Sequence, residues 1–298
     1  MRTDPGTVLS FVKMEGAGND FVVFDAFENT VGPTPALARR LADRRLGVGA
    51  DQVLWVGPTG VPGADFAYRI FNADGSEAEM CGNGARAVAA HLARRGLLRD
   101  GRAVLSVKRG LVPVSVSPEG NAAAVIGRPD FSTSTPDFRM GSDVSVFHSG
   151  EGLPGFPVPG SSRRLHVVTV GNPHAVTVVG SEEEMDALMA SAGALLQKDP
   201  RFPNAVNAGF LLPVTRTRAL LKVWERGTGP TPSCGTGASA AAAVGMALGL
   251  FDRRVSLEMP GGTLTVEALD GGELELTGPV STVFEGRAGI PGELLRAG

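Results

Sequence analysis

The chain has 298 residues, which is enough for two domains of ordinary size. It is 43% hydrophobic and 20% charged with a formal net charge of -3, so it has a globular composition without the basic excess that nucleic-acid binding requires. No basic stretch is followed by an apolar block at the amino end, and the longest apolar segment, about residues 238–251, is shorter than the ~20 residues that cross a bilayer. We therefore expect a cytoplasmic protein that binds neither nucleic acid nor membranes.

Local patterns in the first half predict two helices among short strands. Thr34 and Pro35 are typical of a helix start, and the apolar periodicity runs from Ala36 to a stop at Gly47. A second helix is expected directly after Cys81. The strands, which are β-rich runs bounded by turn residues, are expected at residues 20–25, 66–71, 103–107 and 112–116.

The second half contains the same kinds of elements. Residues 129–164, rich in proline, serine and glycine, are interpreted as a connector with a loose loop rather than a packed element. Ser181 and Glu184 form a capping box before one helix, and Cys234 precedes another. Strands are expected at residues 174–179, 219–224, 255–259 and 264–269, with a final segment at 280–286 that returns to the first domain.

One constant spacing relates the two halves. The only two cysteines begin the sequences CGNGA and CGTGA, and 234 - 81 = 153. The triplets GND at residue 18 and GNP at residue 171 have the same separation, as do Asn72 and Glu225. Because one offset fits separate stretches, domain duplication explains the pattern better than a chance match of glycine-rich sequence.

The duplication predicts the fold class. We expect an α+β protein of two pseudo-symmetric duplicated domains, each a curved mixed or antiparallel β-sheet around a central α-helix. Alanine dominates residues 85–93 and 238–247, so both helices are slim enough to be surrounded by strands. The expected domains are residues 1–127, completed by residues 280–298, and residues 128–279.

The two cysteines suggest a chemistry. Small residues at a helix start leave backbone N–H groups uncovered, which together with the helix dipole can bind a carboxylate and lower the pKa of a cysteine there. Two domains that faced one another would place a thiol on each side of a ligand. Inverting an amino acid requires one group to remove the α-proton and another to return a proton to the opposite face. A cofactor-independent racemase or epimerase is therefore the favoured hypothesis.

Several longer motifs carry a resemblance to a known family. They occur in the order KMEGAGNDFVVFD, GVGADQ, YRIFNADGSEAEMCGNGAR, VGNPHAV, FPNAVNAGF, WERGTGPTPSCGTGASA, MPGGTL and LTGPVSTVFEG. In these motifs the chain resembles the diaminopimelate epimerase family over nearly its whole length. The resemblance implies conversion of L,L-diaminopimelate to the meso form, in lysine and peptidoglycan precursor synthesis, by a homodimer that needs no cofactor or metal.

The resemblance also assigns roles to individual residues. It makes Cys81 and Cys234 the acid/base pair, and it gives His174 and Glu225 the support of the thiols and the α-amino group, without saying which serves which thiol. The α-carboxylate would be held by Gly82, Asn83, Gly235 and Thr236. The remaining substrate-binding residues would be Asn19, Gln52, Asn72, Asn172, Asn207 and Arg226, with Arg226 gripping the remote carboxylate.

Two positions depart from the family pattern. Glu15 stands where a histidine is common, which puts a supporting role of that side chain in doubt, and Ala87 replaces a frequent third cysteine. The loop at residues 140–164 is longer than usual and is interpreted as a surface insertion. The other histidines, His91, His148 and His166, are interpreted as structural or surface residues.

Other classes of protein fit less well. Both cysteine motifs match GxGxxA, but no hydrophobic strand directly precedes them, as a dinucleotide-binding site requires. A P-loop lacks its Gly-Lys-Ser/Thr, and the cysteines lack the close spacing of metal ligands. A redox protein with a switchable cysteine pair remains an alternative, as does a racemase for another amino acid, which would not require Arg226, Asn72 and Asn207 together.

Overall fold

The chain folds into two compact units. A computed structural model describes residues 7–139 and 153–295. The first unit comprises the residues up to 124 together with those from 278 onward, and the second comprises residues 125–277. Both boundaries lie slightly before those expected from the sequence. The first falls within strand β8 (Ala122–Gly127), and the second falls at the end of strand β19 (Leu274–Gly278). The α+β class and the duplication are confirmed.

The first unit is mostly β-structure with two α-helices. Its helices are α1 (Pro35–Ala42), α2 (Gly82–Arg94) and the short 3-10 helix η1 (Gly292–Leu295). Its strands are β1 (Thr7–Gly16), β2 (Asn19–Asp25), β3 (Gln52–Gly57), β4 (Phe66–Asn72), β5 (Glu77–Ala78), β6 (Arg102–Val107), β7 (Gly110–Val116), the first part of β8, and β20 (Ser281–Ile290). The four strands predicted in this half are therefore present.

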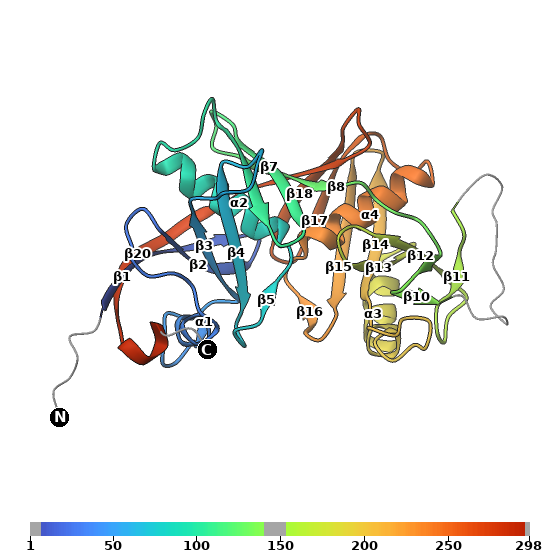
Figure 1. Cartoon of the computed structure of the whole chain (residues 1–298). Helices are drawn as coiled ribbons and strands as arrows, with labels where there is room; N and C mark the ends of the chain where they lie inside the picture. Colours follow the sequence, from blue (N-terminus) through green and yellow to red (C-terminus); the bar gives the residue numbers. More distant parts are fainter. Residues whose placement is uncertain (1–6, 140–152, 296–298) are drawn as a thin grey trace. The chain divides into compact units, whose positions relative to one another are not determined.

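A helix packs on each face of this sheet. Strands β1 and β2 are antiparallel, β2 and β3 parallel, β3 and β4 antiparallel, and β4 and β6 parallel. Val53 belongs to the cluster with Leu37 and Leu41 of α1, whereas its neighbour Leu54 faces Gly84 of α2. This alternation buries both faces of the strands, which accounts for their nearly continuous apolar sequence (Figure 1).

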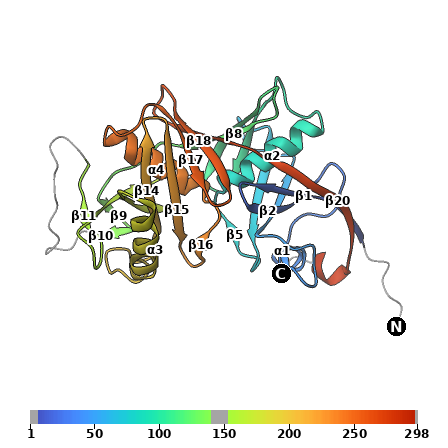
Figure 2. The ribbon, with the colours of Figure 1, turned by 180° about the vertical axis from the view of Figure 1, so that it is seen from behind.

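The last long strand returns to the start of the chain. Strand β20 pairs antiparallel with β1, from Thr7 opposite Ile290 to Glu15 opposite Ser281. Figure 2, seen from behind, shows β20 running beside β1 toward η1. The hydroxyl of Thr34 donates to the carbonyl of Leu294 at 2.7 Å, which joins the start of α1 to η1.

The second unit repeats this arrangement. Its helices are α3 (Glu182–Leu196) and α4 (Gly235–Ala247). Its strands are the end of β8, β9 (Ser134–Thr135), β10 (Phe138–Arg139), β11 (Phe156–Pro157), β12 (Arg164–Thr169), β13 (Pro173–Val178), β14 (Asn207–Thr215), β15 (Arg218–Glu225), β16 (Gly229–Thr231), β17 (Arg254–Met259), β18 (Gly262–Ala268) and β19. The four strands predicted in this half are again present.

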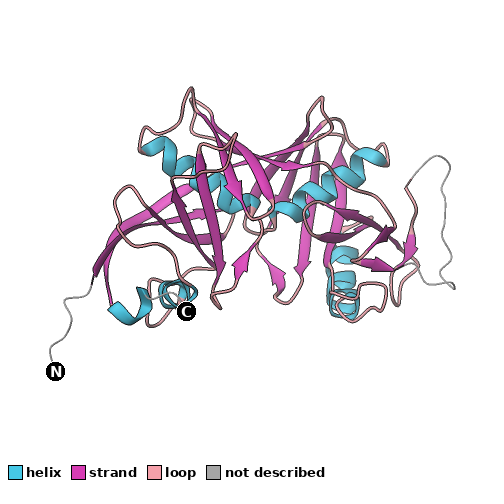
Figure 3. Cartoon of the chain, viewed as in Figure 1, coloured by secondary structure: helices cyan, strands magenta, loops and turns pink. Residues whose placement is uncertain are grey.

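The pairing senses of the second unit match those of the first. Strands β12 and β13 are antiparallel, β13 and β14 parallel, β14 and β15 antiparallel, and β15 and β17 parallel. Helix α3 packs on one face through Gly193 against Trp224, and α4 packs on the other through Gly237 against Val223. Figure 3 shows the helices in cyan among the strands in magenta. The duplication seen as a constant spacing is thus a duplication of topology.

Two predictions about local structure were wrong. Helix α1 ends at Ala42 and not at Leu46, because the carboxylate of Asp43 accepts the backbone N–H groups of Arg45 and Leu46 and forms a turn. The connector at residues 129–164 is not only loose loop, because Phe138 and Phe156 are buried in the core of the second unit and lie in edge-to-face contact. Residues 140–152, including His148, lie outside the described residues.

The described helices include none that is both long and apolar enough to cross a bilayer. The buried sides of the strands and the alanine-rich helices instead form the interior of each unit.

Two glycines of β20 test how this strand docks. A Cβ added at Gly286 would lie 2.5 Å from the ring of Phe11, the residue directly opposite on β1, whereas one added at Gly289 meets nothing within 4 Å. We expect Gly286→Ala to lower the free energy of unfolding by about 1–3 kcal/mol through overpacking, and Gly289→Ala to cause no such loss. Urea unfolding of both variants measures this, and equal stabilities would contradict the docking.

Candidate functional site

Cys81 caps the amino end of α2. Its backbone is extended, and its Sγ accepts a hydrogen bond from the N–H of Gly84 at 3.3 Å. Gly82, Asn83 and Gly84 are buried in the first turn of the helix. A Cβ at Gly84 would lie 2.3 Å from the hydroxyl of Tyr68, so only glycine lets the helix start approach the sheet this closely.

Tyr68 is a site residue that the sequence analysis did not name. It is fully buried on β4, and its hydroxyl has no hydrogen-bond partner among the described residues. Burial, with a smaller effect of the negative charge at Cys81, raises its pKa well above the usual value. Tyr68 is therefore a neutral phenol in the electrostatic environment of the thiol.

Arg86 is a second residue that was missed. It lies on α2, it is completely buried, and its guanidinium donates to Oδ1 of Asn83 at 2.7 Å and to the carbonyl of Pro279 at 3.0 Å. Burial lowers its pKa to about 10, while negative charge at Cys81 and Glu15 opposes this shift, so Arg86 stays cationic at neutral pH. An arginine within an alanine-rich helix expected to be buried was the available signal.

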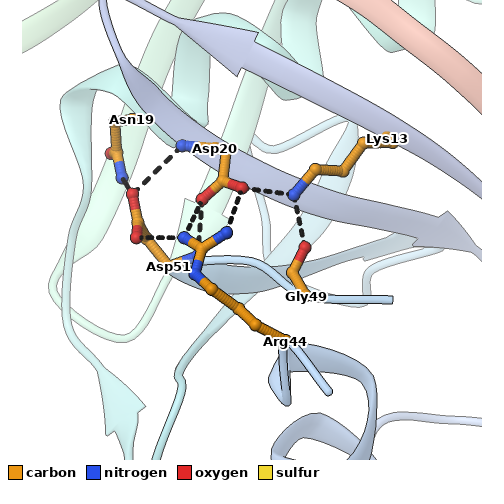
Figure 4. Close-up of polar contacts among 6 residues, drawn as sticks. All are labelled: Lys13, Asn19, Asp20, Arg44, Gly49 and Asp51. Atoms are coloured by element: carbon orange, nitrogen blue, oxygen red, sulfur yellow. Dashed lines mark hydrogen bonds and ion pairs between the residues drawn. The ribbon is translucent and has the colours of Figure 1, made fainter. Parts of the chain in front are cut away.

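The predicted amides of the first unit lie at strand ends. Nε2 of Gln52 on β3 donates to Oδ1 of Asn72 on β4 at 3.0 Å, and Asn72 donates to the hydroxyl of Ser76. Oε1 of Gln52 is buried without a hydrogen-bond partner in the described part of the chain. Asn19, at the start of β2, donates to a carboxylate oxygen of Asp51 at 2.8 Å (Figure 4). A buried acceptor on Gln52 suits a ligand that donates hydrogen bonds.

Cys234 repeats the geometry of Cys81 at the start of α4. Its φ and ψ are -138 and 110, against -142 and 113 for Cys81, and its Sγ accepts the N–H of Gly237 at 3.4 Å. The hydroxyl of Thr236 lies 3.6 Å from this sulfur. Each unit therefore carries one sulfur inside the hydrogen-bonding field of a helix amino end.

The end of β15 brings three predicted residues together. Glu225 accepts a hydrogen bond from the hydroxyl of Thr231 at 2.6 Å. Asn207, opposite this end of the strand on β14, accepts the backbone N–H of Arg226 at 2.9 Å. The side chain of Arg226 contacts the carbonyl of Asn204 at 3.4 Å. Asn207 therefore fixes the backbone from which the Arg226 side chain extends.

His174 is the one histidine that was predicted to support the reaction. It is buried on β13, where its Nε2 lies 2.8 Å from Oδ1 of Asn172. Burial lowers its pKa to about 3, and the positive charge of Arg226 adds to the effect. His174 is therefore neutral near pH 7, with the Nε2 proton donated to Asn172. Asn172, Asn207 and Arg226 thus lie around His174.

The titratable side chains give no sign of a metal centre. Within residues 7–139 and 153–295, no group of three or more His, Cys, Asp and Glu side chains is arranged to hold a metal ion.

Sequence comparison relates the chain to one enzyme family. A family model described as diaminopimelate epimerase matches residues 11–131 and 166–283. The chain is 43% identical over 289 residues to the diaminopimelate epimerase of Burkholderia thailandensis, covering 95% of this chain and 99% of the relative. It is 42% identical over 286 residues to that of Paraburkholderia xenovorans, with the same coverage.

Solved structures of lower identity share the fold. A hydroxyproline epimerase from Agrobacterium vitis aligns with a TM-score of 0.63 at 15% identity, over 99% of this chain and 96% of that one. A phenazine biosynthesis protein of the PhzF family from Bacillus anthracis aligns with a TM-score of 0.64 at 16% identity, over 95% and 99%. At these identities the likeness concerns the fold alone.

Removing the buried guanidinium should destabilise the first unit. Arg86→Met removes the donor to the carbonyl of Pro279 and to Oδ1 of the buried Asn83, and losing a charged hydrogen bond to a buried acceptor costs about 1–3 kcal/mol. Arg86→Lys, which keeps a cation, should lose less. Arg69→Met is the control, because Arg69 pairs with Glu77 at the surface and contributes under about 1 kcal/mol. Denaturant unfolding that gave equal losses for Arg86→Met and Arg69→Met would contradict the role of Arg86.

His174 should make the protein less stable in mild acid. Its folded pKa of about 3 lies below the ordinary value of 6.5, so between these values the unfolded chain binds a proton that the folded chain does not. Stability is therefore lost as the pH falls below 6.5, at up to about 1.4 kcal/mol per pH unit from this group. Urea midpoints at pH 7 and pH 5 should separate more for the wild type than for His174→Gln. The same separation in both proteins would show that His174 is not the cause.

Proposed function

The chain belongs to the diaminopimelate epimerase family, and we propose that it inverts one α-carbon of L,L-diaminopimelate to give the meso form. The observation that carries the proposal is the repeated sulfur at a helix start. Cys81 and Cys234 are each the N-cap of an alanine-rich helix, with nearly equal backbone angles and sulfur contacts. Family membership supports the choice of substrate, and the repeated cysteine caps support proton transfer by two thiols.

The thiols perform the inversion as a pair. One cysteine acts as thiolate and removes the α-proton, and the other acts as thiol and delivers a proton to the opposite face of the same carbon. At the end of the step the two sulfurs have exchanged protonation states, so the reverse reaction uses the same groups in exchanged roles. The helix amino ends favour the thiolate form at each position.

The helix starts also stabilise the reacting carbon. Removal of an α-proton moves negative charge toward the carboxylate, so preorganised donors lower the barrier when they bind its oxygens. We assign this role to the backbone N–H groups of Gly82, Asn83, Gly235 and Thr236. Arg86 supports the first pair, because its guanidinium holds the side chain of Asn83.

The second amino acid centre of the substrate requires its own contacts. Arg226 can bind the remote carboxylate in bidentate fashion, and the amides of Asn72 and Asn207 suit the remote amine. Glu225 and His174 support the thiols and the α-amino group. Gln52 contributes its buried acceptor to the same binding site.

The proposed enzyme is a cytoplasmic homodimer without a cofactor. We propose that it uses no cofactor, because the two thiols and the helix amino ends supply both proton transfer and charge stabilisation. A cytoplasmic location fits a lysine and peptidoglycan precursor enzyme. A homodimer follows from the family resemblance.

Isotope exchange tests the function. Purified protein, treated with chelator and free of pyridoxal phosphate, is mixed with L,L-diaminopimelate in heavy water. We expect deuterium at the α-carbon together with formation of the meso isomer, and Cys81→Ala or Cys234→Ala should each lower net turnover by at least about 10³-fold, because each removes one of two obligatory proton carriers. Proton NMR and chiral chromatography follow the two events.

Two controls accompany this test, and the second distinguishes a diaminopimelate epimerase from an amino-acid racemase of broader use. Ser256→Ala, on β17 away from the named residues, should keep the wild-type rate. A panel of other amino acids distinguishes an epimerase for diaminopimelate from a racemase of broader use, which would turn over substrates without a remote carboxylate. Absence of exchange with diaminopimelate, or near-normal turnover by either cysteine variant, would refute the two-thiol proposal.

A further inference from the structure

The side chain of Asn19 is bound to a carboxylate. Its Nδ2 donates to Oδ2 of Asp51 at 2.8 Å, across the starts of the adjacent parallel strands β2 and β3 (Figure 4). A carboxylate can only accept hydrogen bonds at neutral pH, so the amide must turn its nitrogen toward Asp51. Its carbonyl oxygen is then turned away from Asp51 and can accept a hydrogen bond from a ligand.

A network of charges holds Asp51 in place. Arg44 donates to Oδ1 of Asp51 at 2.8 Å and binds both carboxylate oxygens of Asp20 at 2.9 and 2.8 Å. Asp20 and Asp51 each also accept the backbone N–H of the other, at 2.8 and 3.2 Å. Arg44 and the backbone N–H of Asp20 thus each bind one oxygen of the Asp51 carboxylate, and the hydrogen bond from its own backbone N–H holds the main chain, so that Asp51 is preorganised to orient Asn19.

The central carboxylate of the network is permanently ionised. Burial opposes the charge of Asp20, but hydrogen bonds from Arg44 and Lys13 lower its pKa well below the usual range. Lys13 also donates to the carbonyl of Gly49, which tethers the loop before Asp51. The network therefore stays intact through the neutral pH range.

At the corresponding positions, the described part of the second unit has no such network. In the first unit Phe21 lies opposite Gln52, and in the second unit the equivalent pair is His174 opposite Asn207. The residues that precede these pairs therefore correspond: Asp20 to Pro173, and Asp51 to Val206. Lys13, opposite Val22, likewise corresponds to Val167, opposite Ala175. Val167 and Val206 are both core residues. Lys13 and Asp51 of the first network thus have apolar counterparts in the second unit.

The repeat partner of Asn19 is held with the opposite polarity. Asn172 lies 153 residues later, and its Oδ1 faces Nε2 of the neutral His174 at 2.8 Å. Its oxygen accepts from His174, so its NH2 group is turned away from His174 and can donate to a ligand. The duplicated amides thus present an acceptor from the first unit and a donor from the second.

We propose that Asp51 is a positioning residue that turns Asn19 to present a carbonyl oxygen, so that this position selects an ammonium group of the substrate over a carboxylate. The choice of diaminopimelate as ligand rests on the proposed function, whereas the orientation of Asn19 does not. The α-carbon of an amino acid bears one ammonium and one carboxylate. When one of two equivalent amides presents an acceptor and the other a donor, the protein can distinguish the ammonium from the carboxylate.

The orientation can be measured without any catalysis. In 1H–15N spectra the two side-chain amide protons of Asn19, assigned by their loss in Asn19→Ala, should be well separated, because one is hydrogen-bonded to a carboxylate. Asp51→Ala should collapse this separation toward that of a mobile asparagine, and Asp51→Asn, whose Oδ1 can still accept, should retain part of it. Unchanged Asn19 signals in Asp51→Ala would overturn the proposal.

A double-mutant cycle tests the consequence for substrate binding. Asp51→Ala should lower kcat/KM for L,L-diaminopimelate about 10-fold, chiefly through KM, whereas in an Asn19→Ala background the same change should cost less than about 2-fold. Asp270→Ala is the control, since Asp270 forms an exposed pair with Arg253 in the second unit and should leave the rate unchanged. Equal losses in both backgrounds would mean that Asp51 acts only on the fold.

The ammonium preference has its own readout. Pimelate has the same chain and carboxylates as the substrate but no amines, so its inhibition constant should change less than about 2-fold in Asp51→Ala. A loss of pimelate binding as large as the rise in KM would contradict selection of an ammonium. If the wild type failed to exchange the α-proton of diaminopimelate, the proposed function would fall, and the amide spectra would still decide the role of Asp51.

Discussion

The structure depends on a sulfur atom that caps a helix. In each unit a cysteine accepts the N–H of the third residue after it, at 3.3 Å for Cys81 and 3.4 Å for Cys234. The first N–H groups of a helix have no partner within the helix, and burying them without one destabilises the fold. Here the sulfur accepts a hydrogen bond from one of these N–H groups. The same field that binds the sulfur stabilises its anion, so the cap that starts the helix is also the group to which we assign the proton transfer.

The duplicated sheet keeps that cap close to the backbone of the strands. Gly84 lies so close to Tyr68 that a Cβ there would be 2.3 Å from the tyrosine hydroxyl, and a Cβ at Gly237 would make a tight contact of 3.1 Å with Val223. Alanine continues this close packing along α2 and α4. A slim helix can thus be buried against the strands along most of its length.

The two units share topology but differ in charge. Arg86 is a buried cation in the first unit, while its repeat counterpart Ser239 is a buried hydroxyl that donates to the carbonyl of Gly235. The ion network around Asp20 has apolar counterparts in the second unit, which instead carries the neutral His174. Duplication therefore provided two sulfurs of equal geometry, and later divergence gave each a different surrounding. An asymmetric substrate requires that difference, since its carboxylate and ammonium are not interchangeable.

The sequence by itself determined the repeat, the strands, the cysteine-capped helices and the family, and it named the candidate site residues. These follow from local signals: a constant spacing, alternating apolar residues, caps, and long motifs that need no knowledge of distant contacts. Only the tertiary structure decided where α1 ends, that Phe138 and Phe156 belong to a core, that Arg86 grips Asn83 and Pro279, and that Asp51 binds Asn19. Arg86 and Pro279 are 193 residues apart, and Asn19 and Asp51 are 32 apart. Such contacts arise when separate elements pack, and no local pattern specifies which charged side chain a distant amide or carbonyl will meet.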